Sequence, residues 1–114
     1  MDLLTNAVES IQVGVEDYRT GTRPRLLSAM RNIHAGILLL YKEVLRRESP
    51  HDSNDVLLMA NISPSRDANG KLIFVDDRKK TVNVQQIKQR FDALGIVTDW
   101  KRFDGVNSVR TDMI

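Results

Sequence analysis

The sequence predicts a mostly α-helical fold, a bundle of about four helices with a small β-hairpin inserted between them. Apolar residues recur at helical spacing in four segments, and one of these, residues 24–48, is apolar on two adjacent stripes. A dense run of turn-forming residues ends in Asn69-Gly70 and is followed by the apolar run 72–75, which is typical of a hairpin. A length of 114 residues is typical of one domain, so we expect a single domain over 1–114.

The first helix is expected from Asp2 to Tyr18, and Thr20-Gly21-Thr22 ends it. Its apolar side chains step by 4, 3, 4 and 3 residues, which puts them on one face. These are Leu4, Val8, Ile11, Val15 and Tyr18. Two interpretations stay open for this face: it belongs to the core of the chain, or it is the surface on which two copies dimerise.

The second predicted helix is long and has a proline near each of its ends. Pro24 suits its first turn, Ser49-Pro50 ends it, and residues 24–48 would be about 37 Å long at 1.5 Å per residue. Two neighbouring apolar stripes run along it, which predicts a helix packed on more than one side. One stripe contains Leu26, Met30, Ile33, Ile37, Leu40 and Val44, and the other contains Leu27, His34, Leu38, Tyr41 and Leu45.

The middle of the chain is less regular. Residues 56–62 are apolar and fit either a strand or a short helix, whereas 63–70 are rich in turn formers. Residues 71–75 then predict the returning strand, and 76–80 a charged surface turn.

Two shorter helices are expected in the last third. Asn83 caps the first, whose apolar face includes Ile87 and Phe91 and which ends at Gly95. Thr98 or Asp99 caps the second, and its stripe contains Phe103, Val106, Val109 and Met113. Because this pattern still runs at Ile114, we expect the natural protein to continue beyond it.

Composition removes several classes of function. There is no cysteine, which excludes disulfides, thiolate zinc sites and redox chemistry, and two histidines are too few to predict a metal site. The glycines are scattered, so neither a phosphate-binding Gly-rich loop nor a hydrolase elbow is present. We therefore expect no cofactor. The longest apolar run, residues 37–41, is far too short for a membrane span, and the N-terminus has no basic signal region, so we expect a cytoplasmic protein.

Two polar clusters lie on predicted helices. Arg31 and His34 are three residues apart, which fits either a phosphate-binding arginine beside a titratable imidazole or a buried histidine within the bundle. Near the end of the chain, Arg110 borders the apolar stripe three residues after Asn107. It either extends toward solvent or binds an anion in a cleft.

A basic run occupies the charged turn: Arg78-Lys79-Lys80. It could contact an RNA backbone, but Asp76 and Asp77 precede it and partly cancel its charge, and such runs are more often solvated turns. The whole chain is close to neutral, with 17 Lys and Arg against 15 Asp and Glu.

The order of these segments resembles HEPN-type domains, which occur in bacterial defence and toxin–antitoxin systems. The resemblance rests on the Leu-rich helix with Arg31-Asn32-Ile33-His34, the insertion with Asn69-Gly70-Lys71, the helix start at 80–83 and the closing segment 109–114. Active members carry an arginine followed after four to six residues by a histidine. Arg110 matches the arginine, with Thr111 where the family often has Asn, Asp or His, and the histidine would fall after Ile114.

The resemblance implies RNA cleavage without a metal by a homodimer. Its histidine would act as general acid or base on a ribose hydroxyl, and Arg110 would hold the scissile phosphate. As it stands, the chain would supply only the arginine, with His34 as a conceivable substitute for the histidine. Possible partners are a second copy, RNA and a cognate antitoxin protein. The rival hypotheses are a non-catalytic dimerisation or protein-interaction module and a helical adaptor unrelated to nucleic acid.

Overall fold

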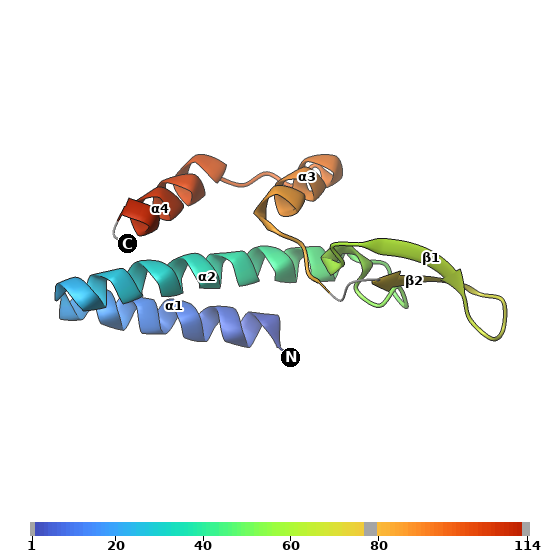
Figure 1. The fold of residues 1–114 in the computed structure, drawn as a ribbon, viewed down its shortest axis with the longest axis horizontal. Coiled ribbons are helices and arrows are strands. Elements are labelled where there is room, and N and C mark those ends of the chain that lie inside the picture. Colours follow the sequence, from blue (N-terminus) through green and yellow to red (C-terminus); the bar gives the residue numbers. More distant parts are fainter. Residues whose placement is uncertain (1, 77–79, 113–114) are drawn as a thin grey trace. The chain divides into compact units, whose positions relative to one another are not determined.

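The computed structural model describes residues 2–76 and 80–112, and within the last helix it leaves the side chains of 107 and 109–112 undescribed. It confirms a mostly α-helical fold with a small antiparallel hairpin (Figure 1). The elements are α1 Leu3–Thr20, α2 Arg23–Glu48, a short 3-10 helix Val56–Leu58, β1 Ile62–Arg66, β2 Leu72–Asp76, α3 Val84–Leu94 and α4 Trp100–Asp112. The chain forms two compact units, residues 1–41 with 98–114 and residues 42–97, and each is described by itself.

In the first unit, α1 and α2 pack closely because small residues meet between them. Asp2 caps α1 by accepting hydrogen bonds from the backbone N–H groups of Leu4 and Thr5. A Cβ atom on Gly36 would lie 2.6 Å from Cγ1 of Ile11 and 2.9 Å from the carbonyl oxygen of Ala7. The glycine therefore lets the two helices approach more closely than any larger residue would allow.

The face that α1 turns inward differs from the apolar stripe expected for the core. Leu3, Ala7, Gly14 and Asp17 are its buried residues. Four of the five stripe residues are instead 37–59% exposed: Leu4, Val8, Val15 and Tyr18. The intramolecular interpretation is therefore wrong for these four residues, whereas Ile11, the fifth, packs against Gly36 of α2. A face of small residues lets α1 approach α2 more closely than a face of branched residues would, which increases the van der Waals contact between the helices.

In the same unit, α4 packs on α2 through aromatic side chains. Tyr41 lies 5.0 Å from Trp100 and 5.5 Å from Phe103, measured between ring centroids. The Tyr41 hydroxyl is also within hydrogen-bond distance of the Thr98 hydroxyl, at 3.2 Å. Asp99, one of the two residues that the sequence offered for this cap, accepts a hydrogen bond from the backbone N–H of Arg102 and so caps α4.

The second unit contains the C-terminal part of α2, the hairpin and α3. Residues 56–62, ambiguous in sequence, divide between the 3-10 helix and an isolated bridge from Met59 to Thr81, and β1 begins at Ile62. The turn at Asn69-Gly70 is confirmed, with Gly70 in the left-handed region that glycine favours.

The helix α3 is built as the sequence predicts. Asn83 and Gln86 form a reciprocal capping box at its N-terminus, and Gly95 ends it at φ 70°. Its buried face supplies Ile87 and Phe91 to the core of the second unit, whereas Leu94, at the end of the same face, is exposed. None of the described helices is both long enough and apolar enough to span a membrane.

Candidate functional site

His34 is a buried residue on the contact between α2 and α4. Its imidazole stacks on the ring of Phe103, with centroids 5.0 Å apart and an angle of 25° between the planes. Arg31, three residues earlier on the same helix, is exposed. The structure therefore fits the interpretation of His34 as a packed histidine better than that of an imidazole working beside Arg31.

Arg110 lies on α4, and its side chain is outside the described part of the structure, as is that of Asn107. The backbone still fixes how far along α4 it lies. Seven residues separate it from Phe103, which corresponds to about 10 Å at 1.5 Å per residue. His34 of α2 packs against Phe103 of α4. The backbone of Arg110 therefore lies about two turns further along α4 than the point at which His34 makes this contact.

A buried carboxylate between α1 and α2 was not anticipated from the sequence. Asp17 is 6% exposed and accepts hydrogen bonds from Ser28 Oγ at 2.5 Å and from Arg25 Nη1 at 3.0 Å. Asn32 joins the cluster by donating from Nδ2 to the backbone oxygen of Ser28. Both Asp17 oxygens are satisfied within the chain, so we assign this cluster a structural role in holding the two helices together.

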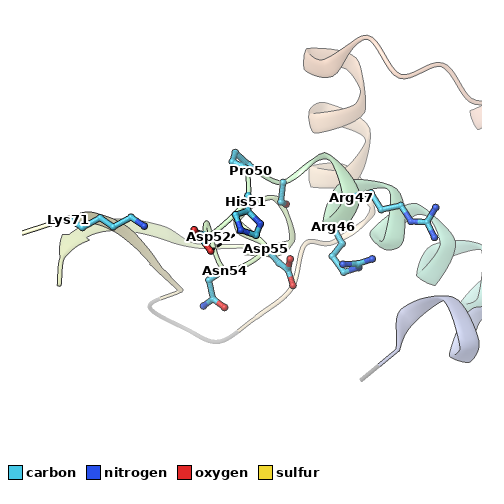
Figure 2. Close-up of a pocket in the computed structure, with 9 residues that line it drawn as sticks. Arg46, Arg47, Pro50, His51, Asp52, Asn54, Asp55 and Lys71 are labelled. Atoms are coloured by element: carbon cyan, nitrogen blue, oxygen red, sulfur yellow. Dashed lines mark ion pairs between the residues drawn. The ribbon is translucent and has the colours of Figure 1, made fainter. Parts of the chain in front are cut away.

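An open cavity of about 860 Å³ lies at the C-terminal end of α2, in the second unit (Figure 2). Arg46 and Arg47 come from the helix end and Lys71 from the hairpin on the other side, with His51 between them. The remaining lining residues are Ser49, Pro50, Asp52, Asn54 and Asp55.

One buried acid orients the two arginines of this cavity. Glu43, 5% exposed, accepts from Arg46 Nε at 2.5 and 3.1 Å and forms an ion pair with Arg47 at 3.7 Å. The guanidinium groups also lie in the last turn of α2, where the helix dipole favours positive charge. Two cationic residues thus contribute to the lining of a polar cavity.

The loop that closes the cavity has an unusual backbone. Asp52, Asn54 and Asp55 all have left-handed conformations, with φ between 55° and 63°. Asn and Asp tolerate this region better than other residues with a side chain. Ser53 Oγ donates to the Pro50 carbonyl oxygen at 2.6 Å, and Ser49 Oγ accepts from the Leu57 N–H. These bonds fix the loop in its strained form.

Two other cationic side chains of this unit donate hydrogen bonds to groups of the same unit. Lys42 donates from Nζ to Oγ1 of Thr81 at 2.8 Å, and Arg90 donates to the Leu57 carbonyl oxygen at 2.6 Å. Partial burial lowers the pKa of both Lys42 and Arg90, because desolvation disfavours the charged form. They join elements of the second unit and are not part of the cavity.

The basic run expected to meet RNA is described only at its last residue. Lys80 is exposed, whereas Arg78 and Lys79 lie outside the described residues. Arg46 and Arg47, which belong to none of the clusters expected from the sequence, are the better-defined cations. Their spacing of three and four residues from Glu43 on a helix was the signal that could have found them.

Comparison of the chain with protein-family models, with curated proteins and with solved structures gave no match. Among the side chains that the structure describes, no group of three or more from His, Asp and Glu is arranged to hold a metal ion.

Proposed function

We propose that this chain is an RNA-binding domain of the HEPN type that works as a homodimer, with Arg110 as its phosphate-holding residue. The observation that carries the proposal is the attachment of α4 along α2 by the ring stacking of Phe103 on His34. The helix that contains Arg110 is thus part of the packed helical unit. A phosphate-binding arginine needs such a rigid support to hold its ligand in one geometry.

The distribution of charge is compatible with contacts to an RNA backbone. Residues 42–97 contain ten Lys and Arg against eight Asp and Glu, whereas the rest of the chain is balanced at seven of each. The whole positive excess therefore belongs to the second unit, where Arg46, Arg47 and Lys71 line the polar cavity. Arginine suits such contacts because its planar fork can donate two hydrogen bonds to one phosphate.

The exposed stripe of α1 supports the homodimer. Leu4, Val8, Val15 and Tyr18 form an apolar seam at alternating spacings of three and four residues, with the half-buried Ile11 at its centre. That is the a/d spacing with which helices pair. On a helical projection, no charged residue falls within about 50° of the centre of the seam, so a second copy could bury it without burying unpaired charge.

The role of Arg110 is tested by single-stranded RNA binding at low salt. We expect Arg110→Ala to weaken binding, at a cost typical of about 1–3 kcal/mol for a charged hydrogen bond. Arg102→Ala is the matched control, because Arg102 lies on the same helix, 90% exposed and paired with Asp99. If both substitutions weaken binding equally, Arg110 contributes only general charge and the proposed site is wrong.

The second candidate is a dimerisation module that binds no nucleic acid, and the exposed seam of α1 favours it as well. The two functions differ in one result: the module would remain a dimer while showing no affinity for RNA at any salt concentration. A chain that is monomeric at high concentration would contradict both.

A further inference from the structure

The β-hairpin has two outer edges, and its register shows which backbone groups face them. Among the described residues, β1 and β2 pair only with each other. The N–H of Asp67 donates to the carbonyl oxygen of Lys71, so this pair is hydrogen-bonded. Hydrogen-bonded and non-bonded pairs alternate in an antiparallel ladder. Leu72 and Phe74 therefore direct their N–H and C=O groups away from β1, along the outer edge of β2.

The two edges are not equivalent. Pro64 lies opposite Phe74 in the ladder, so the outer edge of β1 lacks a donor at its centre. The edge of β2 keeps its donors and carries apolar side chains, of which Leu72 and Val75 are 51% and 41% exposed. Proline is one of the devices that protect an edge strand from pairing. Of the two, β2 is therefore the edge that can accept another strand.

A groove lies beside that edge. A cavity of about 430 Å³ is lined on one side by residues 73–76 of β2 and on the other by Asp52, Ser53 and Asn54. The loop residues and the strand thus both contribute to the lining, so a segment lying along β2 would contact both. Its ends differ in charge, with Lys71 just before β2 and Asp52 and Asp76 at the other end.

We propose that the outer edge of β2 binds an extended segment of a partner protein by antiparallel β-strand addition. The segment has a basic residue at its N-terminal end, next to Asp52 and Asp76, then alternating β-branched residues, and an acidic residue at its C-terminal end, next to Lys71. Backbone hydrogen bonds to Leu72 and Phe74 supply affinity, and the end charges set the direction. The added strand makes a three-stranded sheet, which is more stable than an isolated hairpin. This surface shares Asp52 and Lys71 with the polar cavity at the end of α2. Its occupant is a protein segment, so peptide binding is measured without RNA and its failure leaves the proposed RNA binding untouched.

The test is an NMR titration of the full chain with two synthetic peptides of equal composition. The first, acetyl-KTVTVTE-amide, has the charge order that fits an antiparallel strand, and acetyl-ETVTVTK-amide has the reverse order. We expect the first peptide to shift the amide signals of residues 72–76 and of Ser53 and Asn54, and to bind about fivefold more tightly than the second. Signal changes along β1 instead, equal affinity for the two peptides, or no change at millimolar peptide would overturn the proposal.

Hydrogen exchange and one pair of variants test the backbone contacts. The outward-facing amides of Leu72 and Phe74 should exchange at least about tenfold more slowly with the first peptide bound. Leu72→Pro removes one outward donor without removing a bond of the hairpin, and should weaken binding about tenfold, whereas Leu72→Ala should remain within about threefold of the unmodified chain. Unchanged exchange at both amides in the unmodified chain would refute strand addition, whatever the variants do.

Discussion

Gly14 of α1 packs against Ile33 of α2 so closely that a Cβ atom on the glycine would lie 2.6 Å from Cγ1 of that isoleucine. The same Cβ would be 3.1 Å from the backbone oxygen of Ala29, which cannot move without displacing α2. The closeness of the two helices thus depends on a residue whose helix propensity is poor.

The first prediction is that Gly14→Ala destabilises the chain. Propensity alone favours alanine by about 1 kcal/mol, but overpacking typically costs about 1–3 kcal/mol and displaces the helices. Gly105 in α4 is the matched control, because a Cβ there meets nothing within 4 Å, so Gly105→Ala should stabilise by about 0.5–1 kcal/mol. Urea unfolding of both variants checks the opposite signs. Stabilisation by both would mean that α1 and α2 are less closely packed than described.

The second prediction concerns the buried carboxylate of Asp17. Removing it in Asp17→Ala leaves the hydroxyl of Ser28 without its acceptor, and we expect a loss of about 2–3 kcal/mol in the free energy of unfolding. Arg25→Ala should cost less than about 1 kcal/mol, because 61% of the Arg25 side chain is exposed and solvent screens the pair. Equal losses in chemical denaturation would show that the ion pair, rather than the buried hydrogen bond, stabilises this helix contact.

These two positions show which parts of the fold can be predicted from the sequence and which cannot. Helical spacing predicted α2 to within one residue of its observed start, and the caps of α3 and the hairpin turn followed from single residues such as Asn83 and Gly70. The inward face of α1 could not be predicted from the sequence. Hydrophobic periodicity places valine rather than glycine in the core, whereas close packing of two helices favours the smaller residue. The inward face of α1 can be identified only when the residues of α2 that pack against it are known.

The candidate site was predictable only in part. Of the two interpretations that the sequence left open for His34, the position of its ring against Phe103 agrees with a histidine buried within the bundle. The cavity at the end of α2 depends on a loop of left-handed residues that brings His51 and the hairpin's Lys71 near two helix-end arginines. Such a meeting of residues far apart in the chain leaves no local pattern in the sequence.

The third prediction tests the seam of α1 as the dimer surface. Val8→Asp places a charge in the seam and should shift the chain from dimer to monomer at micromolar concentration, because burying an unpaired carboxylate is strongly unfavourable. Val13→Asp is the control, since Val13 is 45% exposed, similar to the 43% of Val8, but lies off the seam. Sedimentation equilibrium measures both. Dissociation by Val13→Asp alone, or by neither substitution, would place the dimer contact elsewhere.

The measurement that tests the central claim most directly is the affinity of the unmodified chain for single-stranded RNA as a function of salt. Each phosphate neutralised on single-stranded nucleic acid contributes about −0.7 to the slope of log K against log salt. Contacts from Arg110 and two or three further cations therefore predict a slope of about −2 to −3. An affinity that stays flat from low to moderate salt, or no binding at low salt, would contradict RNA binding and leave the chain as a dimerisation module.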